Sequence, residues 1–285
     1  MRGPAVRPSG TALVLGVLVG AAITMGRAYA DEAAAPPSPD LVKQASAPIS
    51  SIFQLRVQDS YAPEFVGADG AGNTLTLSMT MPLPRYRLLP LPQLSLLTMP
   101  TAVTLPSGDT GFGDMRFLDI AVLDAGHDVL FGIGPAFVFP TASDRTTGQG
   151  KWQAGPAAAV AIAPRRWLAG ILAYNPVSFG GDPMRSRANA LFLQPFVTLQ
   201  LGGGWFVRSQ PQIVFDWTSR KQLVPIDLGV GRVFRIGRRQ VSCFVEPFWN
   251  ASTAGPAPRY GITFGMSFLY PNFWRRMLGG AGDED

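Results

Sequence analysis

Residues 74–81 read TLTLSMTM, and this stretch contains the pattern that decides the fold. Four apolar side chains alternate in it with four hydroxyl-bearing ones: Leu75, Leu77, Met79 and Met81 against Thr74, Thr76, Ser78 and Thr80. Successive side chains of a β-strand point to opposite faces of the sheet. Strict alternation therefore predicts a strand with one apolar face and one polar face.

The same two-residue period recurs along the chain from about residue 50. Turn sequences such as GADGAG at 67–72 and STAGPAP at 252–258 separate the alternating runs. The 32 Gly and 26 Pro argue against a helical bundle, because both residues destabilise helix interiors. We predict an all-β chain of about 12 strands, centred near residues 55, 77, 96, 118, 134, 157, 173, 195, 211, 229, 245 and 265.

Two architectures produce many alternating strands. A soluble β-sandwich or barrel buries the apolar faces, whereas a membrane barrel turns them toward lipid and keeps the polar faces toward its lumen. The alternation alone does not distinguish these architectures, since it does not show which face meets water.

Strand length and aromatic residues favour the membrane barrel. The runs span about 10–14 residues, where membrane strands need about 9–11 and soluble strands average about 5–6. Trp205 and Trp217 bracket one strand, at a spacing of roughly 28–30 Å along a tilted barrel axis. We interpret aromatic residues near strand ends as candidates for two aromatic girdles: Trp152, Trp167, Trp205, Trp217, Trp249 and Tyr270.

Ionisable groups on the polar faces favour the same interpretation, because a solvated lumen tolerates them. The candidates for lumen and selectivity residues are Arg56, Asp114, Arg116, Lys151, Arg208, Asp216, Asp227 and Glu246. Such a lining either sets the selectivity of a pore or forms salt bridges that close a small barrel. Twelve strands lie between the filled eight-stranded barrels and the open sixteen-stranded ones, so both alternatives stay open. The predicted fold is a transmembrane antiparallel up-and-down β-barrel over residues 49–270.

Residues 1–30 have the three parts of a secretory signal peptide. Arg2 and Arg7 form a basic start, residues 11–24 form an apolar run, and a final AYA motif predicts cleavage after Ala30. The apolar run is shorter than the roughly 20 residues that span a bilayer, which disfavours a membrane anchor.

Two further segments flank the predicted barrel. Residues 31–48 form an Ala/Pro-rich lead-in that we expect to be flexible, with one helical turn near Leu41. Residues 271–285 form a C-terminal tail that we expect to be disordered, with a periplasmic contact through Phe273 and Trp274 as the alternative.

The charge balance says little about partners. The formal net charge of +5 falls to +2 once the three arginines of the signal peptide are removed. No basic cluster is longer than a pair, and the chain is expected to be exported, so we exclude nucleic acid as a partner. The Arg pairs are expected to lie in solvated turns, with contact to anionic lipid or lipopolysaccharide as the alternative.

The residue inventory argues against catalysis. The chain has one His and one Cys, which excludes multi-His metal sites, thiolate clusters and an internal disulfide. We expect His127 to be a solvated turn residue and Cys243 to be a small lipid-facing residue. We therefore predict a protein that is not an enzyme, with no catalytic residues, no metal and no cofactor.

Five sequence segments also indicate a family resemblance: GFGDMRF (111–117), GIGPAFVFPTASD (132–144), GQGKWQAGPAA (148–158), LFLQPFVT (191–198) and VPIDLGVGRVFRIG (224–237). In this order they resemble a group of transporter-like bacterial outer-membrane β-barrel proteins, akin to proteins linked with meta-pathway phenol degradation. The resemblance covers roughly residues 48–270. It implies an exported barrel in the outer membrane of a Gram-negative bacterium, and it carries over no substrate and no functional residue.

Three functions follow as alternatives. The first is a porin-like passive transporter or channel for small molecules, among which the resemblance places hydrophobic or aromatic ones. The second is a non-transporting structural or ligand-binding barrel whose lumen is occluded, for instance by the lead-in. The third is a soluble periplasmic β-rich binding protein. The expected partners are outer-membrane lipid, lipopolysaccharide, the barrel-assembly machinery and an unidentified small-molecule solute.

Overall fold

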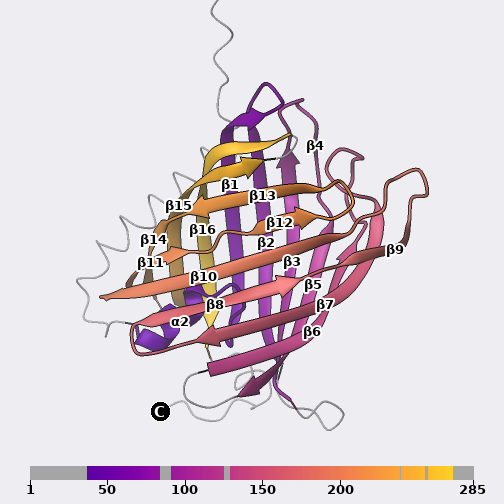
Figure 1. The fold of residues 1–285 in the computed structure, drawn as a ribbon. Coiled ribbons are helices and arrows are strands. Elements are labelled where there is room, and N and C mark those ends of the chain that lie inside the picture. The colour runs from indigo at the N-terminus through magenta and orange to yellow at the C-terminus, as the bar shows by residue number, and fades with distance from the viewer. Residues whose placement is uncertain (1–36, 84–90, 125–128, 238, 254–255, 272–285) are drawn as a thin grey trace, which may run out of the picture.

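The computed structural model describes residues 37–83, 91–124, 129–237, 239–253 and 256–271. The predicted signal peptide with its cleavage site, His127 and the tail beyond residue 271 lie outside the described residues. Most of the described chain is β-strand, and Figure 1 shows these strands as one continuous curved wall.

One antiparallel sheet closes on itself to form this wall. β1 (Phe53–Val66) pairs with β2 (Gly72–Leu83) along one edge and with β16 (Ala257–Tyr270) along the other. β16 pairs in turn with β15 (Arg239–Thr253). The other strands are β3 (Gln93–Thr104), β4 (Thr110–Gly111), β5 (Met115–Asp124), β6 (Val129–Phe139), β7 (Lys151–Ile162), β8 (Trp167–Tyr174), β9 (Val177–Gly181), β10 (Ala190–Gly202), β11 (Trp205–Ser209), β12 (Ile213–Asp216), β13 (Lys221–Asp227) and β14 (Gly229–Ile236).

Several short strands follow one another along the chain and together cross the barrel wall once; we call each such crossing a stave. β8 continues into β9, β11 into β12 and β13 into β14, while β4 is a short extension ahead of β5. The described residues therefore form a closed, antiparallel barrel of 12 staves. Each of the twelve predicted centres falls within one stave, so the predicted fold class is confirmed.

The two faces of the wall differ as the alternation predicts, with the polar face inside. On β1, Gln54 and Arg56 are 2% and 9% exposed, while Leu55 between them is 39% exposed. On β2, Leu77 faces outward and is exposed, whereas Thr80 faces inward and is buried. An apolar outer face is the arrangement of a membrane barrel. A soluble barrel with its apolar faces turned inward is therefore not the fold of this chain.

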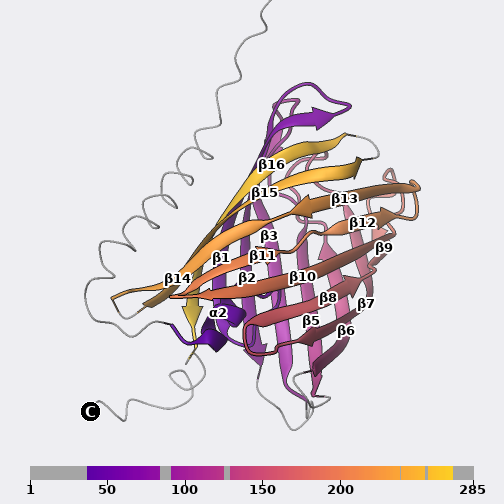
Figure 2. The ribbon, with the colours of Figure 1, turned by 60° about the vertical axis from the view of Figure 1, so that its left-hand side comes forward.

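A helix lies inside the barrel near one end, as Figures 1 and 2 show. α2 (Pro39–Ser46) begins at Ser38, whose Oγ accepts a hydrogen bond from the Leu41 N–H at 3.3 Å. Ser followed by Pro and Asp is a strong helix-start signal. Eight residues make about two turns, more than the single turn expected near Leu41. Among the described residues, no helix is long and apolar enough to cross a membrane.

One face of α2 packs against the inner surface of the wall. Leu41, Val42 and Ala45 lie on this face and contact inward side chains of β11, β14, β15 and β16: Phe206, Val233, Phe244 and Leu269. A glycine makes room for one of these rings, because a Cβ at Gly231 would lie 2.3 Å from Cζ of Phe206. The sequence thus provides an apolar floor for α2 within a mostly polar interior.

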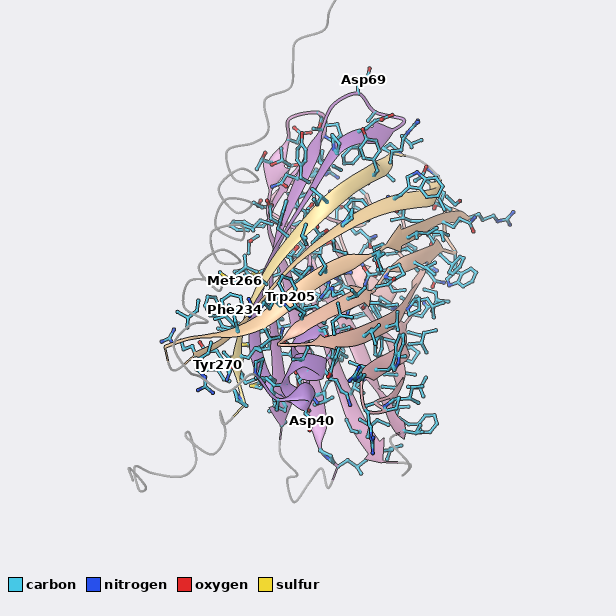
Figure 3. All side chains as sticks on the ribbon, turned by 90° about the vertical axis from the view of Figure 1, so that its left-hand side faces the viewer. Asp40, Asp69, Trp205, Phe234, Met266 and Tyr270 are labelled. Carbon is cyan, nitrogen blue, oxygen red and sulfur yellow. The ribbon has the colours of Figure 1, made fainter. Side chains whose placement is uncertain are left out.

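The barrel has two distinguishable ends. We call the end where β1 begins and α2 lies the helix end, and the opposite end the loop end; Figure 3 labels Asp69 at the loop end and Asp40 of α2 toward the helix end. The turn at 163–166 closes the helix end with four residues. Longer connections at 140–150 and 182–189 lie at the loop end.

Candidate functional site

A polar cavity of about 310 Å³ lies inside the barrel, beside Pro48 just after α2. Side chains of β5, β8, β11 and β15 line one part of it, and inward side chains of β1, β2, β3 and β10 with the segment between β11 and β12 line the rest. Hydroxyl and amide groups dominate this part of the lining: Gln58, Ser60, Thr76, Ser78, Thr80, Thr98, Gln194, Gln210 and Gln212. Such a wall offers both hydrogen-bond donors and acceptors to a solute.

Four ionisable side chains line the same cavity: Arg56, Arg116, Arg208 and Glu246. Arg208 and Glu246 form a buried two-point ion pair, with Nε to Oε2 at 2.6 Å and Nη2 to Oε1 at 3.2 Å. The Arg208 guanidinium also lies over the Phe244 ring, 3.6 Å from its centroid. Arg208 Nη1 is buried and has no hydrogen-bond partner within the described chain. The cavity's one carboxylate is therefore fully engaged by one arginine.

Arg116 is held by neutral partners. Its Nη1 donates to the Tyr174 hydroxyl at 3.3 Å and to Oε1 of Gln212 at 3.4 Å. Its guanidinium lies 5.8 Å from the centre of the Phe192 ring, which stacks on Tyr174 at 4.8 Å. These contacts orient the guanidinium in the cavity, and no carboxylate of the described residues forms an ion pair with it.

Arg56 joins the wall to α2. Its Nη2 donates to the carbonyls of Ala45 and Ala47 at 3.0 and 3.2 Å, and its Nε donates to Ser267 Oγ at 3.1 Å. Gln210 Nε2 donates to the carbonyl of Ser46. A cation at a helix C-terminus satisfies carbonyls that the helix leaves unbonded and interacts favourably with the helix dipole. The C-terminal end of α2 is thus fixed beside the polar cavity.

A second cavity of about 310 Å³ borders α2 at Lys43 and Gln44 and is mainly apolar. Inward side chains of β3, β5, β7, β8 and β10 line it: Leu94, Ile120, Val122, Ala159, Ala161, Leu168, Leu172 and Phe196. Lys43 crosses to the wall, where its Nζ donates to the carbonyl of Ala163 at 3.0 Å. Pro48 and Leu172 line both cavities, so the segment after α2 separates a polar space from an apolar one.

The structure brings four of the eight predicted lumen residues together in the polar cavity, and the other four line neither cavity. Asp114 accepts the N–H groups of Ala142 and Gln149 and so fixes the loop at 140–150. The Nζ of Lys151, at the start of β7, donates to the carbonyl of Asp182 at 2.6 Å.

The remaining two are also bound locally. Asp216 accepts hydrogen bonds from Thr218 and Ser219 and so organises a turn. Asp227 accepts the N–H of Gln210 at 2.7 Å, where the staves β11–β12 and β13–β14 are interrupted. Neither Asp216 nor Asp227 lines the polar cavity, although Asp216 lies on the stave that supplies Arg208, Gln210 and Gln212 to it.

The six girdle candidates fall into two groups along the barrel. Trp167, Trp205 and Tyr270 lie at strand ends nearest the helix end, and Figure 3 labels Tyr270 on that side. Trp152, Trp217 and Trp249 lie toward the loop end. The five tryptophans are 37–53% exposed, so their rings are on the outer surface. Cys243 also lies on the outward strand face, buried among Phe234, Val241 and Met266.

Sequence reasoning missed most of the neutral lining of the polar cavity. The alternation in the sequence does show Thr76 and Ser78 on a polar face, but the lumen candidates comprise only ionisable residues. Tyr174 gave no signal, because β8 reads WLAGILAY and is apolar on both faces. The position of α2 in the lumen was expected only as one version of the occluded barrel.

Comparison with solved structures supports the same fold. The COG4313 outer membrane channel from Pseudomonas putida F1 matches with a TM-score of 0.58 at 12% identity, covering 80% of this chain and 98% of that one. The KdgM porin matches with a TM-score of 0.41 at 9% identity, over 76% and 98% of the two chains. The outer membrane phospholipase A from Escherichia coli gives 0.42 at 12% identity, over 83% and 99%.

The conclusion on fold rests on the first of these structures. No protein-family model matches the sequence, and no curated protein matches it either. At this level of identity the likeness concerns the arrangement of the strands.

Proposed function

We propose that this protein is an outer-membrane channel through which small solutes diffuse passively along the polar side of its lumen. One observation carries the proposal: a closed wall with an apolar outer face encloses a polar cavity of about 310 Å³. Water-filled lumens of membrane barrels are lined in this way, with polar side chains alternating with lipid-facing ones. α2 occupies part of the cross-section, so the proposed path is narrow.

The two groups of aromatic side chains support a membrane position for the wall. Trp and Tyr prefer the two interfaces of a bilayer, where one part of the ring is apolar and another meets water. We infer that the helix end faces the periplasm, that residues 1–30 are removed after Ala30, and that the barrel-assembly machinery inserts the chain. Lipopolysaccharide would then surround the loop end.

Solute flux in liposomes tests the proposal. The purified chain should first show the gel shift on boiling that marks a folded barrel. Liposomes containing it should then swell in glycerol and not in the much larger raffinose, because the cavity admits only small solutes. Liposomes without protein give the background.

Two neighbouring positions give a matched pair of variants. Ser78 lines the cavity, whereas Leu77 faces outward and is 41% exposed. Ser78→Trp should slow glycerol entry severalfold by filling the cavity, and Leu77→Trp should leave it unchanged. Equal flux through both variants would contradict a path through this cavity.

A second candidate function is a barrel that α2 keeps closed. The hydrogen bonds of Arg56, Gln54 and Gln210 to the C-terminal carbonyls of α2 favour it. Folded wild-type protein that gives no flux with any solute would support this candidate and count against the first.

A finer proposal concerns hydrophobic or aromatic solutes. The resemblance to proteins linked with phenol degradation motivates it, and the apolar cavity beside α2 supports it. Faster entry of phenol than of glycerol through the protein, after correction for protein-free liposomes, is the expected result. An enzymatic role has less support, since the only His of the chain lies in the predicted turn at 124–128.

A further inference from the structure

The charges that line the polar cavity are unbalanced. Three guanidinium groups and one carboxylate face it, and the carboxylate of Glu246 is bound at two points by Arg208. Arg56 and Arg116 form no ion pair within the described residues. Among the described residues, three guanidinium groups thus line the cavity for one carboxylate, and neither Arg56 nor Arg116 has a carboxylate within ion-pair distance.

Arg116 is the arginine best placed to meet a solute. Arg56 is committed to two carbonyls of α2 and to Ser267, and Arg208 is committed to Glu246. Within the part of the chain that the structure describes, Arg116 makes two long hydrogen bonds, both to neutral groups, and it remains partly exposed. An anion that replaced these long contacts with short, charge-assisted ones would gain binding energy.

The wall around Arg116 suggests the rest of such a solute. Thr76, Ser78 and Thr98 present hydroxyl groups to the cavity, and Gln194 and Gln212 present amides. Hydroxyl groups of a ligand can donate to and accept from all of these groups. A narrow lumen with excess positive charge also concentrates anions and repels cations.

We propose that the polar cavity binds a small hydroxyl-bearing carboxylate, with Arg116 as the residue that holds its carboxylate. This inference rests on the proposed channel function, since the solute reaches the cavity by that path. The planar guanidinium matches a carboxylate through two parallel hydrogen bonds, which an ammonium group does not reproduce. The Ser, Thr and Gln side chains of the wall bind the hydroxyl groups.

Calorimetry on the folded full-length protein in detergent tests the binding site without any need for transport. Gluconate is the probe, and sorbitol is its uncharged counterpart with the same number of carbons. Gluconate should bind saturably and at least about tenfold more tightly than sorbitol, the size expected for a charge-assisted hydrogen-bond pair. Equal affinity for the two probes would overturn the proposal.

Variants at two arginines separate the site from a general charge effect. Arg116→Gln should lower gluconate affinity about tenfold, and Arg116→Lys should restore part of it. Arg232→Gln is the matched control, because Arg232 lies over the exposed ring of Trp205, at 5.3 Å, and lines neither cavity. The gel shift on boiling confirms that each variant is folded. Unchanged gluconate affinity in Arg116→Gln would contradict the proposal.

Planar bilayers supply a second readout under a KCl gradient. The reversal potential of the wild type should show preference for chloride, and Arg116→Gln should move it toward zero while Arg232→Gln does not. A cation-selective wild type would overturn the anion site. If the bilayers showed no conductance while gluconate binding still depended on Arg116, the proposed channel would be wrong and the binding site would be supported.

Discussion

The two cavities inside the barrel have the same volume and opposite linings. The polar cavity is bounded mainly by β1, β2, β3 and β10–β12, where inward side chains such as Thr76 and Ser78 carry hydroxyl groups, and β5, β8 and β15 complete its lining. The apolar cavity is bounded mainly by β7 and by the helix-end halves of β5 and β8, where inward side chains such as Ile120 and Ala159 are hydrocarbon. We call these two parts of the wall the polar arc and the apolar arc.

The difference shows that a closed barrel need not have a uniform lumen. Backbone pairing closes both arcs equally, because each stave bonds to its neighbours on both sides. In the apolar arc, Ile120 packs in a buried cluster with Leu118, Leu172 and Tyr174, whose side chains also border the polar cavity. In the polar arc the side chains remain able to bind water or a solute. A solvated path is therefore confined to one side of the lumen.

The same substitution in each arc should give opposite outcomes, and this is the largest effect expected. Ile120 is 2% exposed and lines only the apolar cavity, so Ile120→Gln should lower the free energy of unfolding by about 4 kcal/mol, through lost packing and an amide buried among hydrocarbon. Thr76→Gln should change it by less than about 1 kcal/mol, because the polar cavity can solvate the amide. Urea unfolding in detergent, followed by tryptophan fluorescence, measures both. Similar losses of unfolding free energy in the two variants would contradict the distinction between the arcs.

The ion pair in the polar arc should behave as a buried pair. Glu246→Gln leaves Arg208 without its counter-ion and should cost about 3 kcal/mol of unfolding free energy. The double variant Arg208→Leu with Glu246→Leu should cost far less, since no lone charge then remains in the wall. If the single variant were as stable as the wild type, water would have to reach this pair freely.

The link between α2 and the polar arc should have a smaller effect. Arg56→Gln removes two hydrogen bonds to the C-terminal carbonyls of α2 and should cost about 1 kcal/mol. The amides of α2 should then exchange with deuterium faster, while amides of β2 keep their protection. Unchanged exchange in α2 would show that its apolar contacts with Phe206 and Phe244 hold it alone.

The smallest expected effect lies outside both arcs, in the loop at 140–150. The Thr146 hydroxyl and the Thr146 N–H both donate hydrogen bonds to Asp144 Oδ1. These bonds hold the pKa of Asp144 below its ordinary value, and the hydroxyl has the larger effect. A lowered pKa means that the ionised form stabilises the folded loop, and this contribution is lost as pH falls through the folded-state pKa. An NMR titration of the Thr146 amide should therefore show a midpoint below about 3.9. A midpoint at or above that value would contradict these hydrogen bonds.

The sequence predicts the strands well where alternation is strict. Residues 74–81 and 197–201 have polar and apolar residues in clear alternation, and both form inward-polar, outward-apolar segments of the wall. Strands such as β6, which reads VLFGIGPAFVF, are apolar on both faces. For these strands the sequence predicts a strand but does not show which face points into the barrel. The apolar arc could not be predicted from the sequence for this reason.

The candidate site was only partly predictable from the sequence. Arg56, Arg116, Arg208 and Glu246 could be selected, because an ionised side chain on the polar face of an alternating membrane strand is expected to meet the solvated lumen. The same rule also selects Asp114 and Asp216, which do not line the cavity. Each lies beside a turn sequence, and this position indicates a loop residue. The neutral lining depends on which staves face one another across the barrel, and one sequence without pairing information does not supply this.

The most direct test of a channel narrowed by α2 is single-channel conductance with and without residues 37–47. The gel shift on boiling shows that the shortened barrel is folded. We predict a small conductance for the full chain and a severalfold larger one after the deletion, because the hydrogen bonds of Arg56 and Gln210 hold α2 across the lumen. The same conductance in both proteins would contradict this account.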